Sequence, residues 1–187
     1  SWYNETLNTS TRGATRAFPA VAVIIAEGNK VTIYDGDDPD LPMWMVFNSF
    51  GSWGNSTAYY LGSAGTISTL SALNGVISVG KTLSSSVYDA LTLIQFISDS
   101  GRQFTSVGTN TSGGTFANNI ANRNSSQGIP TGNTEIISGI VNDVAMTVLP
   151  NAPIDPATGI QVPTIAVATD GGVSVITDAG DVFDSSY

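Results

Sequence analysis

The sequence predicts an all-β chain built from blade-like antiparallel hairpin repeats, as in a partial β-propeller. Three observations support this fold class: apolar β-branched runs recur along the chain, two-residue turns follow them, and Asp-rich turns end the units. A β-sandwich could be assembled from the same hairpins and is the structural alternative. We expect residues 1–187 to form a single all-β module that is a fragment of a longer polypeptide.

Each repeat joins an apolar run to a second run across a tight turn. Gly and Asn residues supply these turns, as at Asn74-Gly75, because they accept the positive φ angles that hairpins require. The first runs lie at residues 21–26, 68–72 and 164–168, and the second runs lie at residues 31–34, 76–80 and 173–176. Three blades cannot close a propeller, so we expect open strand edges that pair with other strands.

Helical spacing competes with the strand pattern in two places, where residues recur at intervals of three or four. One set is Val87, Leu91, Ile94 and Ser98, and the other is Ile137, Ile140, Val141 and Val144. We therefore expect a short helix or two at most. Residues 105–133 are rich in Ser, Thr, Asn and Gly, which predicts a long loop or insertion.

The composition excludes several classes of function. The chain has no His and no Cys, which removes Ser-His-Asp and Cys-His catalysis, the usual zinc sites and disulfides. A formal net charge of −9 would repel a phosphate backbone, so nucleic acid is not an expected partner. No apolar run approaches the roughly 18 residues of a membrane span. Charged residues make up only 11%, which predicts a surface rich in hydroxyl and amide groups, typical of extracellular and virion proteins.

An acidic turn follows the second apolar run of the first repeat. It contains Asp35, Asp37, Asp38 and Asp40. Alternating carboxylates on a turn can gather the oxygen ligands that Ca²⁺ requires, so these four residues are the candidate metal ligands. The spacing is not that of an EF-hand, because Pro39 occupies a ligand position and no Glu closes the loop. A solvated acidic turn without metal is the alternative, and no other cofactor is expected.

Three aromatic residues lie in a segment rich in Gly, Ser and Asn, where few apolar neighbours could bury them. They are Trp53, Tyr59 and Tyr60. Aromatic rings of this kind can stack on sugar faces, so these residues are the candidate ligand-binding residues; local loop packing is the alternative. The run from Met43 to Phe47 is almost wholly apolar and is expected to belong to the core.

Longer runs carry a resemblance to known proteins. They are residues 16–27, 31–39 and 41–47 near the start, and residues 141–149, 152–159 and 164–176 near the end. These runs resemble segments of virion-associated proteins of tailed bacteriophages, mostly marine, and the later ones resemble the propeller-like part of that family. The resemblance covers most of the chain except residues 48–65 and 105–133. It implies a tail or fibre component located in the virion, outside the cell, and brings no catalytic residues.

We therefore expect a structural and adhesive component of a phage tail or fibre that binds a host-surface glycan. Its expected partners are other virion proteins or copies of itself. One alternative is a carbohydrate-active enzyme, a glycoside hydrolase or depolymerase, that uses the clustered acids, because such enzymes require paired carboxyl groups. A second alternative is a purely structural packing module without a ligand.

Overall fold

The computed structural model describes residues 19–49, 59–62, 65–82, 90–107, 113–126, 132, 134–156 and 158–186. Strands account for 54% and helix for 2%, which confirms the all-β class. The strands form antiparallel sheets in chain order, and the described strands do not close into a barrel. The predicted antiparallel hairpins are therefore present, and their arrangement is consistent with the β-sandwich alternative.

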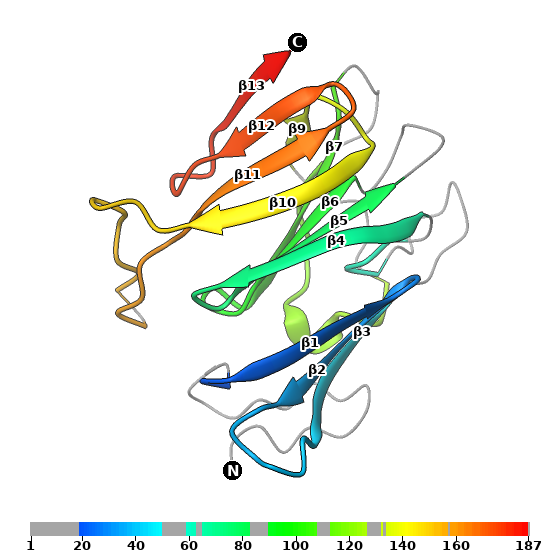
Figure 1. The fold of residues 1–187 in the computed structure, drawn as a ribbon, viewed down its shortest axis with the longest axis vertical. Helices are drawn as coiled ribbons and strands as arrows, with labels where there is room; N and C mark the ends of the chain where they lie inside the picture. The colour runs from blue at the N-terminus through cyan, green and yellow to red at the C-terminus, as the bar shows by residue number, and fades with distance from the viewer. Residues whose placement is uncertain are drawn as a thin grey trace.

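Three sheets follow one another along the chain (Figure 1). The N-terminal sheet contains β1 (Ala22–Glu27), β2 (Lys30–Asp35) and β3 (Met43–Asn48). The central sheet contains β4 (Thr66–Leu73), β5 (Val76–Thr82), β6 (Leu91–Gln95), β7 (Ser100–Ser106) and β8 (Gly114–Thr115), with β9 (Glu135–Ile136) parallel to β7. The C-terminal sheet contains β10 (Val141–Thr147), β11 (Thr164–Thr169), β12 (Gly172–Ile176) and β13 (Val182–Ser186).

Local turn chemistry forms the hairpins. Between β4 and β5, Asn74 and Gly75 have φ angles of 50° and 72°, the pair of positive values that a tight hairpin turn requires. Phe96, the residue after β6, donates its backbone N–H to Gly75 O at 2.8 Å, which links this turn to the end of β6. The turn residues thus fix the register of three neighbouring strands.

The central sheet is buried on both faces. One core cluster, which includes Val31, Phe47, Ile77 and Phe96, lies between the N-terminal and central sheets. A second cluster, which includes Leu93, Val144 and Val167, lies between the central and C-terminal sheets. The sheets therefore pack face to face, the arrangement in which alternating apolar residues of each strand reach a core.

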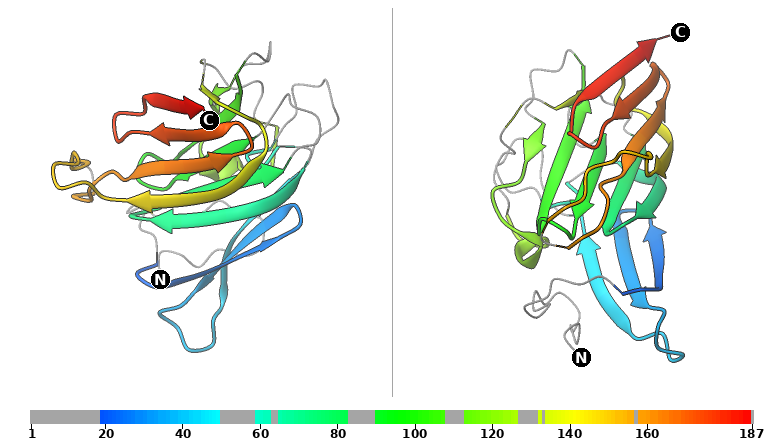
Figure 2. Two further views of the ribbon diagram at one scale, coloured as in Figure 1. Left: turned by 45° about the horizontal axis from the view of Figure 1, so that its top comes forward. Right: turned by 90° about the vertical axis from the view of Figure 1, so that its left-hand side faces the viewer.

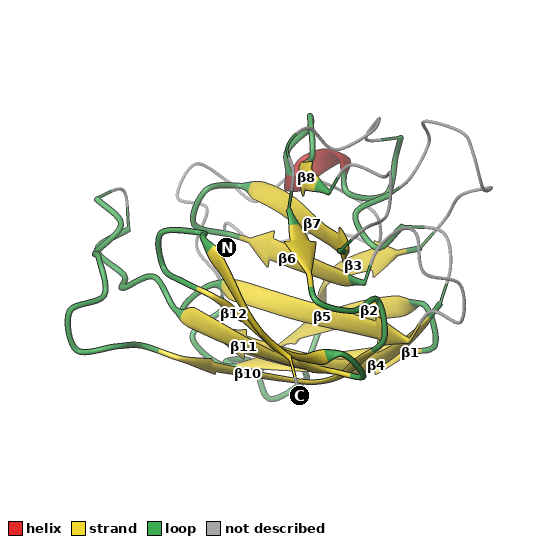
Figure 3. Ribbon diagram, turned by 90° about the horizontal axis from the view of Figure 1, so that it is seen from above, coloured by secondary structure: helices red, strands yellow, loops and turns green. Residues whose placement is uncertain are grey.

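The central and C-terminal sheets approach most closely where β10 runs beside β4, as Figures 1 and 2 show. The Ser68 hydroxyl donates to Val141 O at 2.6 Å, and the Thr69 hydroxyl donates to Asp143 Oδ1 at 3.0 Å. Gly80 permits this contact, because a Cβ there would lie 2.5 Å from the Val141 side chain. Seen from above, β8 and the single turn of 3₁₀ helix η1 (Ile120–Asn122) lie on the side opposite β10 (Figure 3).

The expectation of a helix around Ile137, Ile140, Val141 and Val144 is wrong. Val141 and Val144 are both buried in β10, and a β-bulge between Val141 and Asp143 shifts the register against β11. The extra residue places side chains three positions apart on the same face, which imitates helical spacing. Leu91 and Ile94 of the other set lie in strand β6, paired on both sides, and Ser98 lies in the following turn; Val87 lies outside the described residues.

Three further expectations concern the apolar run at residues 43–47, the segment 105–133 and membrane-spanning helices. Trp44, Met45, Val46 and Phe47 are buried, which confirms the core assignment of that run. Within 105–133, the described residues include the end of β7, β8 and η1. No helix in the described ranges is long and apolar enough to cross a membrane.

Candidate functional site

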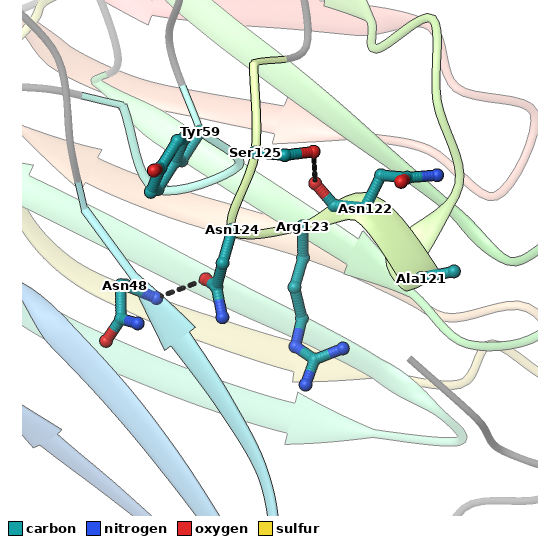
Figure 4. A pocket seen from close by; sticks show the side chains of 7 residues that line it. All are labelled: Asn48, Tyr59, Ala121, Asn122, Arg123, Asn124 and Ser125. Atoms are coloured by element: carbon teal, nitrogen blue, oxygen red, sulfur yellow. Dashed lines mark hydrogen bonds between the residues drawn. The ribbon is translucent and has the colours of Figure 1, made fainter. Parts of the chain in front are cut away.

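A pocket opens where β3 ends and where two connecting segments meet it (Figure 4). Its volume is about 270 Å³. Seven residues line it: Asn48, Tyr59, Ala121, Asn122, Arg123, Asn124 and Ser125. Five of these carry an amide, hydroxyl or phenol group, so the lining is polar but largely uncharged. Such groups can both donate and accept hydrogen bonds.

The side chain of Asn124 fastens the 121–125 segment to the end of β3. Its Oδ1 accepts a hydrogen bond from Asn48 N at 2.7 Å, and its Nδ2 donates to Val46 O at 2.9 Å. The amide thus pairs with the backbone of β3 at Val46 and Asn48, two residues that also lie opposite β2. These two bonds fix the orientation of the amide, and with it the position of the pocket wall.

Arg123 fastens the same segment from the interior of the protein. Only 1% of its surface is exposed. Its Nε donates to Val46 O at 2.6 Å, Nη1 donates to Ile120 O at 3.3 Å, and the guanidinium carbon lies 5.4 Å from the centre of the Phe47 ring. In Figure 4 the side chain extends away from Tyr59. Arg123 therefore supports the pocket and is not a surface cation.

Successive turns shape the 119–125 segment. Asn122 N donates to Asn119 O at 3.0 Å, and Ser125 N donates to Asn122 O at 2.9 Å. The Ser125 hydroxyl donates to the same Asn122 oxygen at 2.8 Å. Ile120 is fully buried in the first core cluster and anchors the segment to the interior. The polar residues that follow it are thereby held at the surface.

Tyr59 and Tyr60 have opposite roles. Tyr59 is half-buried and lines the pocket, whereas Tyr60 is 0% exposed. The Tyr60 ring stacks on Phe116 at 4.6 Å, and its hydroxyl donates to Asn118 O at 2.6 Å. The prediction that Tyr60 contacts a ligand is therefore wrong, because its ring is enclosed by the core. Tyr60 instead anchors the turn that presents Tyr59.

Of the two predicted aromatic residues that the structure describes, Tyr59 lines the pocket and Tyr60 does not. Trp53 lies outside the described residues. Asp35 is the last residue of β2, and Asp37, Asp38 and Asp40 lie on the connection from β2 to β3; none of the four lines this pocket.

The carboxylates of the acidic turn organise its backbone. Asp35 Oδ1 accepts from Asp37 N at 3.0 Å, Asp38 Oδ1 accepts from Asp40 N at 3.0 Å, and Asp37 Oδ2 accepts from Ala20 N at 2.9 Å. Such bonds are typical of Asp in turns. Among the described residues, no group of three or more acidic side chains is arranged to hold a metal ion. Among the described residues, Asp35 Oδ2 is buried and has no hydrogen-bond partner. Neither observation tests calcium binding at this turn, which stays a prediction.

Sequence reasoning missed Asn48 and the residues at 121–125. The residues at 121–125 lie in a segment predicted to be a long loop, and Asn48 is separated by 76 positions from its partner Asn124. The one local signal was the polar run Asn122-Arg123-Asn124-Ser125 directly after buried Ile120. Comparisons with protein-family models, with curated proteins and with solved structures gave no match.

Proposed function

We propose that the chain is a structural and adhesive module of a phage tail or fibre, and that it binds a glycan of the host surface. The observation that carries the adhesive part is the pocket at the end of β3, which combines the Tyr59 ring with amide and hydroxyl groups. Amide and hydroxyl groups can both donate to and accept from sugar hydroxyls, and an aromatic ring can pack against the apolar face of a sugar. The phage setting rests on the sequence resemblance alone.

The open edges of the sheet stack support the structural part. Among the described strands, β1 pairs with β2 alone and β13 pairs with β12 alone. Both strands expose apolar side chains: Val23 and Ile25 on β1, and Phe183 on β13, which is 63% exposed. Unpaired edges with apolar residues favour association with further strands. Neighbouring virion proteins or further copies of this chain would supply them.

The lining of the pocket favours binding over hydrolysis. None of the seven lining residues is Asp or Glu. Glycoside hydrolysis by the common mechanisms needs two carboxyl groups across the scissile bond. The clustered acids that suggested an enzyme lie on the turn between β2 and β3 and bond to the backbone. Adhesion is therefore the function that this geometry supports best.

The proposal is tested by adhesion to bacterial cells. The labelled chain is incubated with a panel of strains, and its binding is competed with surface polysaccharide purified from each strain. We expect saturable binding to a subset of strains and competition by their polysaccharide, without release of new reducing ends. Binding to no strain would contradict the adhesive function.

Release of reducing ends would instead favour the enzyme alternative. A variant with Asp35→Asn, Asp37→Asn and Asp38→Asn then separates the two functions. The adhesive function predicts that a correctly folded triple variant binds the same cells as the original chain, because these residues do not line the pocket. Loss of polysaccharide turnover in the triple variant would assign catalysis to the acidic turn.

A further inference from the structure

We infer that the pocket at the end of β3 recognises one unit of an uncharged sugar and discriminates against acidic sugars such as uronic and sialic acids. This inference rests on the proposed adhesive function and specifies its ligand. It follows from the size of the pocket, from the chemistry of its lining, from the engagement of Arg123 and from the charge of the chain.

The size limits the ligand to a small unit. The volume of about 270 Å³ lies just below the range of roughly 300–1,000 Å³ that is typical of pockets for drug-sized molecules. One sugar ring matches such a volume, with the rest of a polysaccharide outside it. The pocket would therefore recognise a terminal or side-branch unit of a polysaccharide.

The lining matches the hydrogen-bonding character of sugar hydroxyls. Each hydroxyl donates and accepts, and an amide offers two donors and an acceptor. Asn48 at the end of β3 and Asn122 and Asn124 of the 121–125 segment line the pocket with amides, and Ser125 adds a hydroxyl (Figure 4). The Asn122 Nδ2 donates to Asn119 Oδ1 at 3.2 Å and the Ser125 hydroxyl donates to Asn122 O at 2.8 Å. The amide of Asn124 is held by two hydrogen bonds, so the wall is organised before a ligand arrives. Such preorganisation reduces the entropy that binding costs.

The Tyr59 ring completes the site from the opposite segment. It lines the pocket without being enclosed by the core, unlike its neighbour Tyr60. The turn holds it in place, because Gly62 N donates to Tyr59 O at 2.8 Å and Tyr60 N donates to Arg123 O at 3.1 Å. An aromatic side chain can pack against the C–H face of a sugar ring while its phenol group remains polar.

The electrostatics exclude an acidic ligand. Arg123 is the one charged residue among the described residues of the lining, and its Nε and Nη1 donate to backbone oxygens inside the protein. Its surface is 1% exposed, so the guanidinium is not presented to a carboxylate in solution. The chain as a whole carries a net charge of −9, which repels anions. An uncharged sugar meets neither difficulty.

The test measures binding of small sugars by saturation-transfer NMR and calorimetry. The neutral probes are the methyl glycosides of glucose, galactose, mannose and N-acetylglucosamine, and the acidic probes are glucuronic and N-acetylneuraminic acids. We expect at least one neutral probe to bind with a dissociation constant on the order of 1 mM, since small ligands gain little energy per atom. Neither acidic probe should bind more tightly than the best neutral probe. Affinity should change less than twofold between low salt and about 1 M salt, because screening acts on charges.

Variants locate the site. Tyr59→Ala should weaken neutral-probe binding about tenfold, as expected for loss of a central aromatic contact. Asn122→Ala should weaken it as well, and Tyr59→Phe should retain most of it. Phe183→Ala is the matched control, because it removes an exposed aromatic ring from β13, on a different sheet. Unfolding curves confirm that each variant is folded.

The outcomes separate this inference from the proposed function. Tighter binding of an acidic probe, no binding of any neutral probe, or equal binding by Tyr59→Ala and the original chain would overturn the inference. Adhesion to bacterial cells, measured independently, would still stand in each of those cases if the glycan bound elsewhere. If the original chain binds a neutral probe but adheres to none of the strains, the proposed function is contradicted and the sugar site stands.

Discussion

Replacing Phe47 by Ala is expected to lower the free energy of unfolding by about 3–5 kcal/mol, the cost typical of removing a buried aromatic side chain. Phe47 is fully buried at the centre of the first core cluster. Its ring lies 6.2 Å from Phe96 edge-on, 6.4 Å from Tyr60 in a stacked arrangement and 5.4 Å from the Arg123 guanidinium. It therefore joins β3 to the central sheet and to the segment that carries the pocket.

Urea unfolding measures this loss, with Phe183→Ala as the control. The control makes the same chemical change where the side chain is 63% exposed, so its cost should stay within about 0.5 kcal/mol, as for most surface substitutions. Equal losses in the two variants would show that Phe47 does not occupy a packed core.

Replacing Arg123 by Met is expected to cost about 3 kcal/mol. The substitution keeps an unbranched side chain but removes two hydrogen bonds from a charged donor, each worth roughly 1.5–3 kcal/mol. Ile120 O loses a donor inside the protein, and Val46 O loses Arg123 while it keeps the Asn124 amide as a donor. The contact of the guanidinium with the Phe47 ring is lost as well. The pocket wall should loosen because Arg123 connects it to β3.

Arg102 provides the matched control for Arg123. Its guanidinium carbon lies at a similar distance, 5.1 Å, from the Phe104 ring, and its Nη1 donates to Gly180 O at 3.2 Å, but the side chain is only half-buried. Partial burial lowers the pKa of Arg102, and the charge of Asp181 partly offsets this effect. Arg102→Met should cost about 1 kcal/mol in urea unfolding, because its hydrogen bond is partly exposed to water and is worth less than a buried bond from a charged donor. A cost equal to or above that of Arg123→Met would contradict the supporting role of Arg123.

The hairpins could be predicted from the sequence because their signals are local. Asn74-Gly75 sits between two apolar runs, and the backbone there adopts the positive φ angles that those residue types favour. The same holds for the alternation in β11 and β12, whose buried and half-buried residues follow the strand period. These elements need only neighbouring residues to specify them.

The parts that were not predicted depend on contacts between distant residues. The bulge in β10 changes which side chains face the core, and only pairing with β11 produces it. Tyr60 is buried because Phe116 and Asn118 cover it, although both lie far along the chain. The pocket needs β3, the 59–62 turn and the 121–125 segment together. No local pattern reports that meeting, so Tyr59 is the one lining residue that the sequence analysis selected.

The most direct test of the sugar-binding pocket is an amide-shift titration of the isotopically labelled chain with the tightest-binding neutral glycoside. If the sugar binds in this pocket, the largest shifts occur at Asn48, Tyr59 and residues 121–125, and they saturate together with a single dissociation constant. The same titration with glucuronic acid should leave these signals unchanged. Shifts confined to the edges β1 and β13 or to the acidic turn at residues 35–40, or the absence of saturable shifts, would contradict sugar binding in this pocket.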